Sequence, residues 1–315
     1  MEQTISQTTK IESNVAKSAF FYMLSMVALV FMALSTGMII FQIINKNIAD
    51  AISNYSGVFS QEALKFAISA IIISTPIYYL VMRQINKNLF SGKIDKNSGV
   101  RKWLTYFILF VSSVVVIGWL IGIINSFLGG ELTIKFVFKA ITAVLISAVI
   151  FTYYLYDIKR ENVVNIKDKT ITIYSYATLA IVIIVLIASF FFIDSPAKTR
   201  NINYDDLIIQ KFSTIDNAIN NYYNDNKKLP ANLDELKSDI NYLIDSDLEN
   251  PLTKKKFDYK AIDNNKYELC ADFKTSNRND NDINQYPYGK RWIHDEGYQC
   301  IRQNVVDISK PVITD

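Results

Sequence analysis

The chain offers few residues for catalysis, and the clearest candidate is a lone histidine. His294 is the only histidine among 315 residues. A Ser-His-Asp or Cys-His centre needs a histidine as general base, so any such centre would have to form around His294. The sequence contains no H-E-x-x-H zinc motif, no P-loop and no G-x-G-x-x-G motif. We therefore interpret His294 as structural and predict no catalytic residues and no cofactor.

An oxygen-rich segment precedes the histidine. The residues NDNDINQ place Asp280, Asp282 and Asn284 at alternating positions, and Ca²⁺ prefers such ligands. The glycine and the final glutamate of a complete EF-hand loop are missing. The segment is thus an incomplete candidate calcium site, and the alternative is a solvated polar loop.

Three charged residues stand four apart near the start of an apolar stretch. GGELTIKFVFKAITAV contains Glu131, Lys135 and Lys139. A glutamate four residues before a lysine favours an ion pair on one helical face, and an ionisable residue inside a membrane marks a functional site. We predict a polar cluster in the membrane or at its outer face. The alternative is that Lys139 only extends toward the lipid headgroups.

A proline interrupts another apolar stretch. Pro76, in ISTPIYYL, lacks the N–H group that a helical hydrogen bond needs. We predict a helix kink, with Ser74 and Thr75 helping to satisfy the freed backbone groups. The kink either shapes a gate or cavity or is a static feature of packing.

Two cysteines, Cys270 and Cys300, are the only ones in the chain. Both lie in its polar C-terminal part. Small domains outside the cytoplasm often use a disulfide to supplement a limited core. We predict that the two cysteines pair, and that closing a loop of about 30 residues contributes roughly 3–4 kcal/mol. The alternative is two buried thiols.

Five apolar stretches must position these residues. A helix crosses about 30 Å of hydrocarbon with roughly 20 mostly apolar residues, and its backbone hydrogen bonds stay within the segment. The chain contains five stretches of this kind, at residues 19–44, 64–82, 103–128, 134–156 and 172–193. The sequence therefore predicts an α-helical membrane bundle of five transmembrane helices.

Basic and aromatic residues predict the orientation of this bundle. Lysine and arginine concentrate before the first stretch and in the loops after the second and fourth, and tyrosine and tryptophan gather at the same ends. Basic loops stay in the cytoplasm, and aromatic rings favour the headgroup level. We predict a multi-pass protein of the plasma or inner membrane, with a cytoplasmic N-terminus and an extracytoplasmic C-terminal domain.

The C-terminal part has the pattern of a small α+β domain, with an amphipathic helix packed on an antiparallel sheet. After a linker at residues 193–201, apolar side chains recur at helical spacing: Ile208, Phe212, Ile215, Ile219 and Tyr222. NLDELKS predicts a short helix capped by its asparagine. FDYKAIDNNKYELCADF predicts a β-hairpin, and RWIHDEGYQCI a further strand.

These patterns divide the chain into four parts. They are an N-terminal cytoplasmic arm (residues 1–17), a four-helix transmembrane domain (18–160), a cytoplasmic loop with the fifth transmembrane helix (161–193), and the extracytoplasmic domain with one disulfide (194–315).

Two resemblances to known families bear on this division. The stretches FFYMLSMVALVFMALSTGMIIFQIINK, VRKWLTYFILFVSSVVVIGWLIGIINSFLGGELTIKFVFKA and VIFTYYLYDIKR resemble a bacterial four-helix integral membrane family labelled only as a domain of unknown function. The resemblance covers about residues 17–160 and implies a fold without an activity. YYNDNKKLPANLDEL, NPLTKKKFDYKAIDNNKYELCADF and the late cysteine resemble the globular part of type IV pilins and type II secretion pseudopilins. The pilin leader and the glutamate of its anchor helix are missing here.

The sequence limits the possible functions mainly by the classes of protein that it argues against. A net charge of +3 does not indicate nucleic-acid binding. The main hypothesis is a non-enzymatic envelope protein that sits in the lipid bilayer and binds an envelope partner through residues 199–315. The alternatives are a small transporter or channel, which needs polar groups facing a cavity, and a membrane-embedded enzyme.

Overall fold

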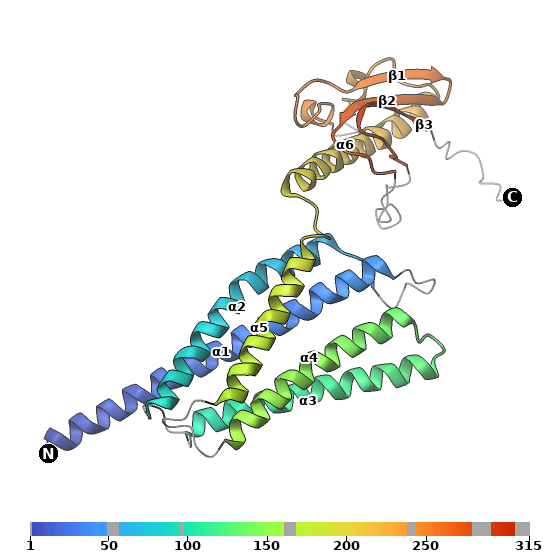
Figure 1. Ribbon diagram of the computed structural model, residues 1–315. Coiled ribbons are helices and arrows are strands. Elements are labelled where there is room, and N and C mark those ends of the chain that lie inside the picture. The colour runs from blue at the N-terminus through green and yellow to red at the C-terminus, as the bar shows by residue number, and fades with distance from the viewer. Residues whose placement is uncertain are drawn as a thin grey trace. The chain divides into compact units, whose positions relative to one another are not determined.

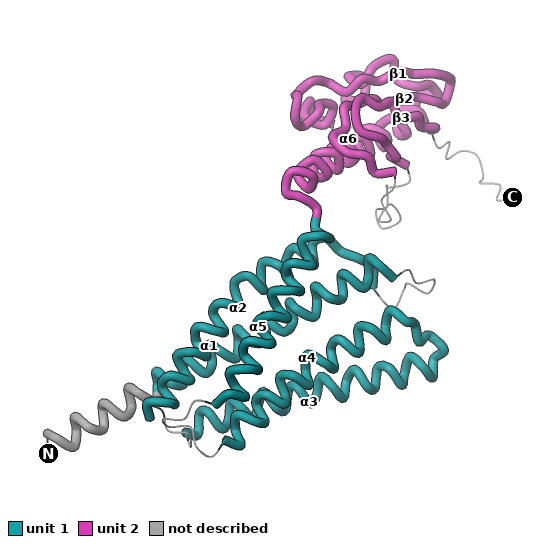
Figure 2. The backbone as a smooth tube through the Cα atoms, viewed as in Figure 1, with its two compact units in different colours: residues 1–193 teal, residues 194–315 magenta. Residues whose placement is uncertain are grey.

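The protein is described here from a computed structural model that covers residues 2–48, 57–92, 94, 98–160, 168–237, 243–278 and 291–305. The chain divides into two compact units (Figure 2), which comprise residues 1–193 and 194–315.

Five long helices build the first unit (Figure 1). They are α1 (Glu2–Asn47), α2 (Gln61–Phe90), α3 (Gly99–Leu128), α4 (Ile134–Lys159) and α5 (Lys169–Ser189). Each is long and apolar enough to cross a membrane, and in α1 this part is Ala16–Asn47. The five predicted helices are therefore confirmed. The last is shorter than predicted, because hydrogen bonds from each amide of residues 190–192 to the carbonyl three residues earlier turn the chain after Ser189.

Side-chain caps determine where three of these helices begin. The amide of Ala63 donates to Ser60 Oγ at 3.2 Å at the start of α2, and the amide of Phe136 donates to Thr133 Oγ1 at 3.2 Å at the start of α4. Asp168 accepts from the amide of Thr170 at 2.8 Å at the start of α5. These bonds satisfy amides of the first turn that have no partner within the helix.

The helices pack as two antiparallel pairs, α1 with α2 and α3 with α4, and α5 lies along α1 and α2 (Figure 1). Ile39, Leu64 and Ala67 are fully buried between them. Large apolar side chains also cover the outside of the bundle, where Leu80 is 66% and Phe110 is 65% exposed. Contiguous apolar surface of this kind suits lipid rather than water.

The proline of α2 does not interrupt the helix, which continues through Pro76. The buried hydroxyls of Ser74 and Thr75 have no hydrogen-bond partner among the described residues. The prediction that these two hydroxyls satisfy the backbone groups freed by Pro76 is therefore wrong.

The second unit consists of a long helix, two short 3-10 helices and a three-stranded antiparallel sheet. In chain order these are α6 (Pro196–Asn226), η1 (Leu233–Leu236), η2 (Asp245–Asp247), β1 (Asp258–Asp263), β2 (Lys266–Phe273) and β3 (Gly297–Asn304), with sheet order β1-β2-β3. The predicted α+β architecture is confirmed, including the hairpin and the third strand. The predicted linker at residues 193–201 is mostly helical, because Ser195 caps α6 and Pro196 fits its first position.

One face of α6 and one face of β2 form the core of this unit. Ile208, Phe212, Ile215 and Ile219 are fully buried on α6. The alternate residues of β2 that face them are also buried, as are Trp292 and the side chains of η1. The predicted helical periodicity is therefore correct.

A disulfide joins Cys270 in β2 to Cys300 in β3. The two residues lie directly opposite each other in the antiparallel register. Since β3 is an edge strand, the disulfide holds it to β2, the central strand of the sheet. The predicted pairing of the two cysteines is confirmed.

Candidate functional site

His294 lies in the core of the second unit rather than in a catalytic arrangement. It is 2% exposed, and its ring stacks on Phe273 with centroids 3.8 Å apart. Neither ring nitrogen has a hydrogen-bond partner among the described residues. Burial lowers the pKa of His294, and the carboxylates of Asp205 and Asp295 oppose that shift only in part. The ring is thus positioned as a neutral packing element and not as a general base beside a nucleophile.

The incomplete calcium site, Asp280, Asp282 and Asn284, lies outside the described residues. Among the residues that the structure does describe, no group of three histidine, cysteine or carboxylate side chains could hold a metal ion.

The three charged residues near the start of α4 do not form the predicted helical series. Thr133 caps α4, so Glu131 precedes the helix, where it is exposed. Glu131 forms no ion pair with another described residue, and the expected pairing on one helical face is wrong. Lys135 and Lys139 are both buried, at 5% and 8% exposure.

The two buried lysines help to hold the chain where it enters α2. Lys135 donates to the carbonyl of Gly57 at 2.9 Å, and the Lys139 ammonium lies 5.9 Å from the centre of the Phe41 ring. Gln42 of α1 accepts from the amide of Ser60 at 2.8 Å. These contacts link α1, α4 and the start of α2, and they give the lysines a structural role at this end of the bundle.

A charge network that the sequence did not reveal ties the opposite ends of three helices together. Arg101 of α3 donates from Nη2 to both the side chain and the backbone carbonyl of Asp157 in α4, each at 2.8 Å. Arg160 also binds Asp157, and its guanidinium lies 4.0 Å from Asp168, the cap of α5. The Arg101 side chain is 2% exposed. The network therefore satisfies a C-terminal carbonyl of α4 and connects α3, α4 and α5.

One signal for this network was present in the sequence. Asp157 is the only carboxylate between Leu132 and Arg160, at an end of the bundle that is otherwise basic. An acidic residue in that setting indicates a partner. From the sequence alone, Arg101 and Arg160 are only basic loop residues that predict orientation.

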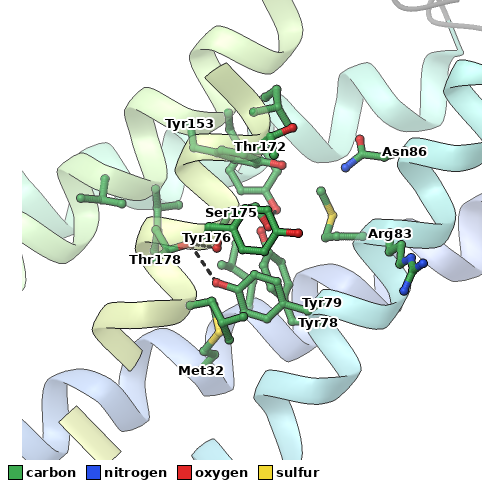
Figure 3. Close-up of a pocket in the computed structure, with 17 residues that line it drawn as sticks. Met32, Tyr78, Tyr79, Arg83, Asn86, Tyr153, Thr172, Ser175, Tyr176 and Thr178 are labelled. Carbon is green, nitrogen blue, oxygen red and sulfur yellow. Dashed lines mark hydrogen bonds between the residues drawn. The ribbon is translucent and has the colours of Figure 1, made fainter. Parts of the chain in front are cut away.

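An aromatic pocket of about 510 Å³ lies beside this network, between α2, α4 and α5 with a contribution from α1 (Figure 3). Five tyrosines line it, Tyr78, Tyr79, Tyr153, Tyr154 and Tyr176. Its volume is within the usual range for small-molecule sites, about 300–1,000 Å³.

Hydroxyl contacts fix the rings on two sides of the pocket. The hydroxyls of Tyr78 and Tyr154 are 3.3 Å apart, and the hydroxyl of Tyr79 is 2.8 Å from Thr178 Oγ1 on α5. Tyr154 and Asn86 also border a small cavity that reaches Tyr22 and Asp157. Tyr154 and Asn86 therefore lie between the pocket and the small cavity that Asp157 borders.

The tyrosines correct the prediction of a uniform aromatic belt. Tyr78 and Tyr154 are 7% and 6% exposed, so they lie inside the bundle. Trp103 and Tyr176 are 67% and 70% exposed, as residues at the headgroup level should be. The sequence did not indicate which of these rings turn inward.

Comparison with known proteins gives one similarity to a family model and no activity. A family model described as Domain of unknown function (DUF5671) matches residues 18–154. Neither the curated proteins nor the solved structures gave a match. The resemblance of the second unit to pilins thus has no support from these comparisons. The matched residues extend from α1 through most of α4 and include four membrane-type helices, and the match ends just before Asp157.

Proposed function

We propose that this protein is a non-enzymatic, multi-pass membrane protein that presents its second unit outside the cytoplasm. There, residues 199–315 bind a protein of the cell envelope. The N-terminus lies in the cytoplasm, and the five spans lead the chain to the outer side.

The disulfide is the observation that carries this proposal. Cys270 and Cys300, the only cysteines of the chain, are bonded to each other in the unit that lies outside the membrane-type helices. Structural disulfides form and persist in oxidising compartments and are rare in the cytosol. This chemistry supports an outer location for the second unit.

The charge distribution of the bundle supports the same orientation. Basic residues cluster where α2 and α4 end and where α3 and α5 begin, at Arg83, Lys87, Arg101, Lys102, Lys159, Arg160 and Lys169. The opposite end has fewer basic residues, and two of them, Lys135 and Lys139, are buried. Basic residues near the ends of membrane spans favour the cytoplasmic side.

The sheet of the second unit offers a surface for a partner. Ile301 packs toward the core, so its neighbours Cys300 and Arg302 lie on the other face. Tyr298 of that face is 59% exposed. An exposed tyrosine beside charged groups is typical of the anchor residues of protein interfaces.

Site-specific photo-crosslinking in intact cells tests this proposal. A photoreactive residue at Tyr298 or Arg302 of the full chain should capture a protein of the envelope. The same residue at Lys87, which is exposed at the basic end of α2, is the matched control and should not capture it. Absence of any envelope protein from both sheet positions, or equal capture from Lys87, would contradict the proposal.

A further inference from the structure

The aromatic pocket changes from apolar to polar along the axis of the bundle. Its deeper part is lined by apolar side chains from three helices: Leu29 and Met32 of α1, Val149 and Ile150 of α4, and Leu179 of α5. Its other end, near the basic ends of α2 and α5, is lined by Arg83, Asn86 and Thr172. A ligand that fills both parts must itself be amphiphilic.

The polar end of the pocket favours a negative charge. Among the described residues that line the pocket, Arg83 is the only charged one and none is a carboxylate. Arg83 forms no ion pair with another described residue and is exposed. An arginine guanidinium binds phosphate through charge-assisted hydrogen bonds, and Asn86 and Thr172 add neutral donors. Figure 3 shows Arg83 and Asn86 on α2, on one side of the grouped tyrosine rings.

The pocket opens on the outside of the helix bundle. Tyr176, one of its walls, is 70% exposed on α5. In a protein that spans a membrane, the ligand that meets such an opening is a lipid. A free anion would leave the apolar part of the pocket unfilled.

We propose that this pocket is a binding site for an anionic phospholipid. One acyl chain lies against the apolar residues between α2, α4 and α5, and the tyrosine rings pack along it. The phosphate of the headgroup contacts Arg83. The site does not depend on the partner proposed for the second unit. It coincides with the end of the bundle assigned to the cytoplasm, where anionic lipids attract basic residues.

Lipid binding by the purified full chain tests this inference. Delipidated protein in a neutral detergent is titrated with phosphatidylglycerol, phosphatidylcholine and inorganic phosphate, and bound lipid is counted by native mass spectrometry. Phosphatidylglycerol should bind about tenfold more tightly than phosphatidylcholine, the factor expected for one charge-assisted contact. Inorganic phosphate should neither bind at the same concentrations nor displace the lipid.

Three variants locate the binding. Arg83→Gln should remove the preference for phosphatidylglycerol, and Ser175→Trp, which fills the pocket, should weaken both lipids. Lys87→Gln removes a charge from the same end of α2 but lies outside the lining, and it should bind as the unaltered chain does.

Equal binding of the two lipids would overturn the inference, and so would equal effects of Arg83→Gln and Lys87→Gln. Displacement of the lipid by inorganic phosphate would assign the site to a free anion and would also overturn it. Because Arg83 is exposed, its variant should retain the melting temperature of the unaltered chain, which separates lost binding from lost folding.

Discussion

Replacement of Asp157 by alanine should destabilise the membrane unit more than any charge change on its surface. The substitution leaves the Arg101 guanidinium, which is 2% exposed, without the carboxylate that it contacts at 2.8 Å. Removal of one partner from a buried ion pair costs about 3–5 kcal/mol. At roughly 2 °C or more per kcal/mol, the melting temperature should fall by about 6 °C or more.

The assay is the fraction of full-length protein that remains monodisperse in detergent after heating, measured by size-exclusion chromatography. Lys159→Gln is the matched control, because Lys159 is exposed two residues after Asp157 on the same helix and a surface change should stay within about 0.5 kcal/mol. The double variant Arg101→Met, Asp157→Leu should recover part of the loss, since Arg101 is then no longer a buried charge without its carboxylate and Arg160 keeps Asp168 at 4.0 Å. Equal melting of Asp157→Ala and Lys159→Gln would refute the reasoning, as would a double variant no more stable than Asp157→Ala.

Three further predictions concern the second unit. Mass spectrometry after alkylation without a reductant should find no free thiol at Cys270 or Cys300. Reduction of the disulfide should lower the stability of the unit by about 3–4 kcal/mol. Two alkylated thiols in natively made protein would contradict the disulfide. Tyr267→Phe should cost about 1 kcal/mol in denaturant unfolding, because its hydroxyl donates to buried Asp216; an unchanged midpoint would show that the bond contributes nothing. Burial lowers the pKa of His294 in the folded protein. As the pH falls, the imidazole is therefore protonated in the unfolded chain at a higher pH than in the folded protein, and the stability should decline below about pH 6.5. His294→Phe should flatten that decline, and an identical pH profile would refute the assignment.

Much of the fold follows from sequence patterns with a direct physical cause. The apolar stretches had to be helices, since a backbone in lipid satisfies its hydrogen bonds internally. The turn at Asp263 fixed the hairpin, and the spacing from Ile208 to Ile219 identified the buried face of α6. In each case the determining residues lie close together in the chain.

The candidate site was harder to predict because it depends on contacts between helices. A membrane helix is apolar all round, so its periodicity does not show which tyrosines turn inward, and Tyr78 and Tyr154 were assigned to the headgroup level instead. Arg101 and Asp157 meet only because α3 and α4 pack antiparallel and bring distant segments to the same end. α6 begins before the predicted helix because Ser195 caps it, a contact that the spacing of apolar residues does not indicate.

Orientation in the membrane is the claim on which the proposed function depends, and paired reporter fusions test it most directly. Alkaline phosphatase is active only outside the cytoplasm, whereas green fluorescent protein folds well only within it. Each is fused to the C-terminus of the full chain and, as a matched control, inserted after Arg160 in the loop between α4 and α5. The C-terminal fusions should give active phosphatase and no fluorescence, and the Arg160 fusions should give the reverse. A fluorescent C-terminus with silent phosphatase would place the disulfide-bonded unit in the cytoplasm and contradict the proposed function.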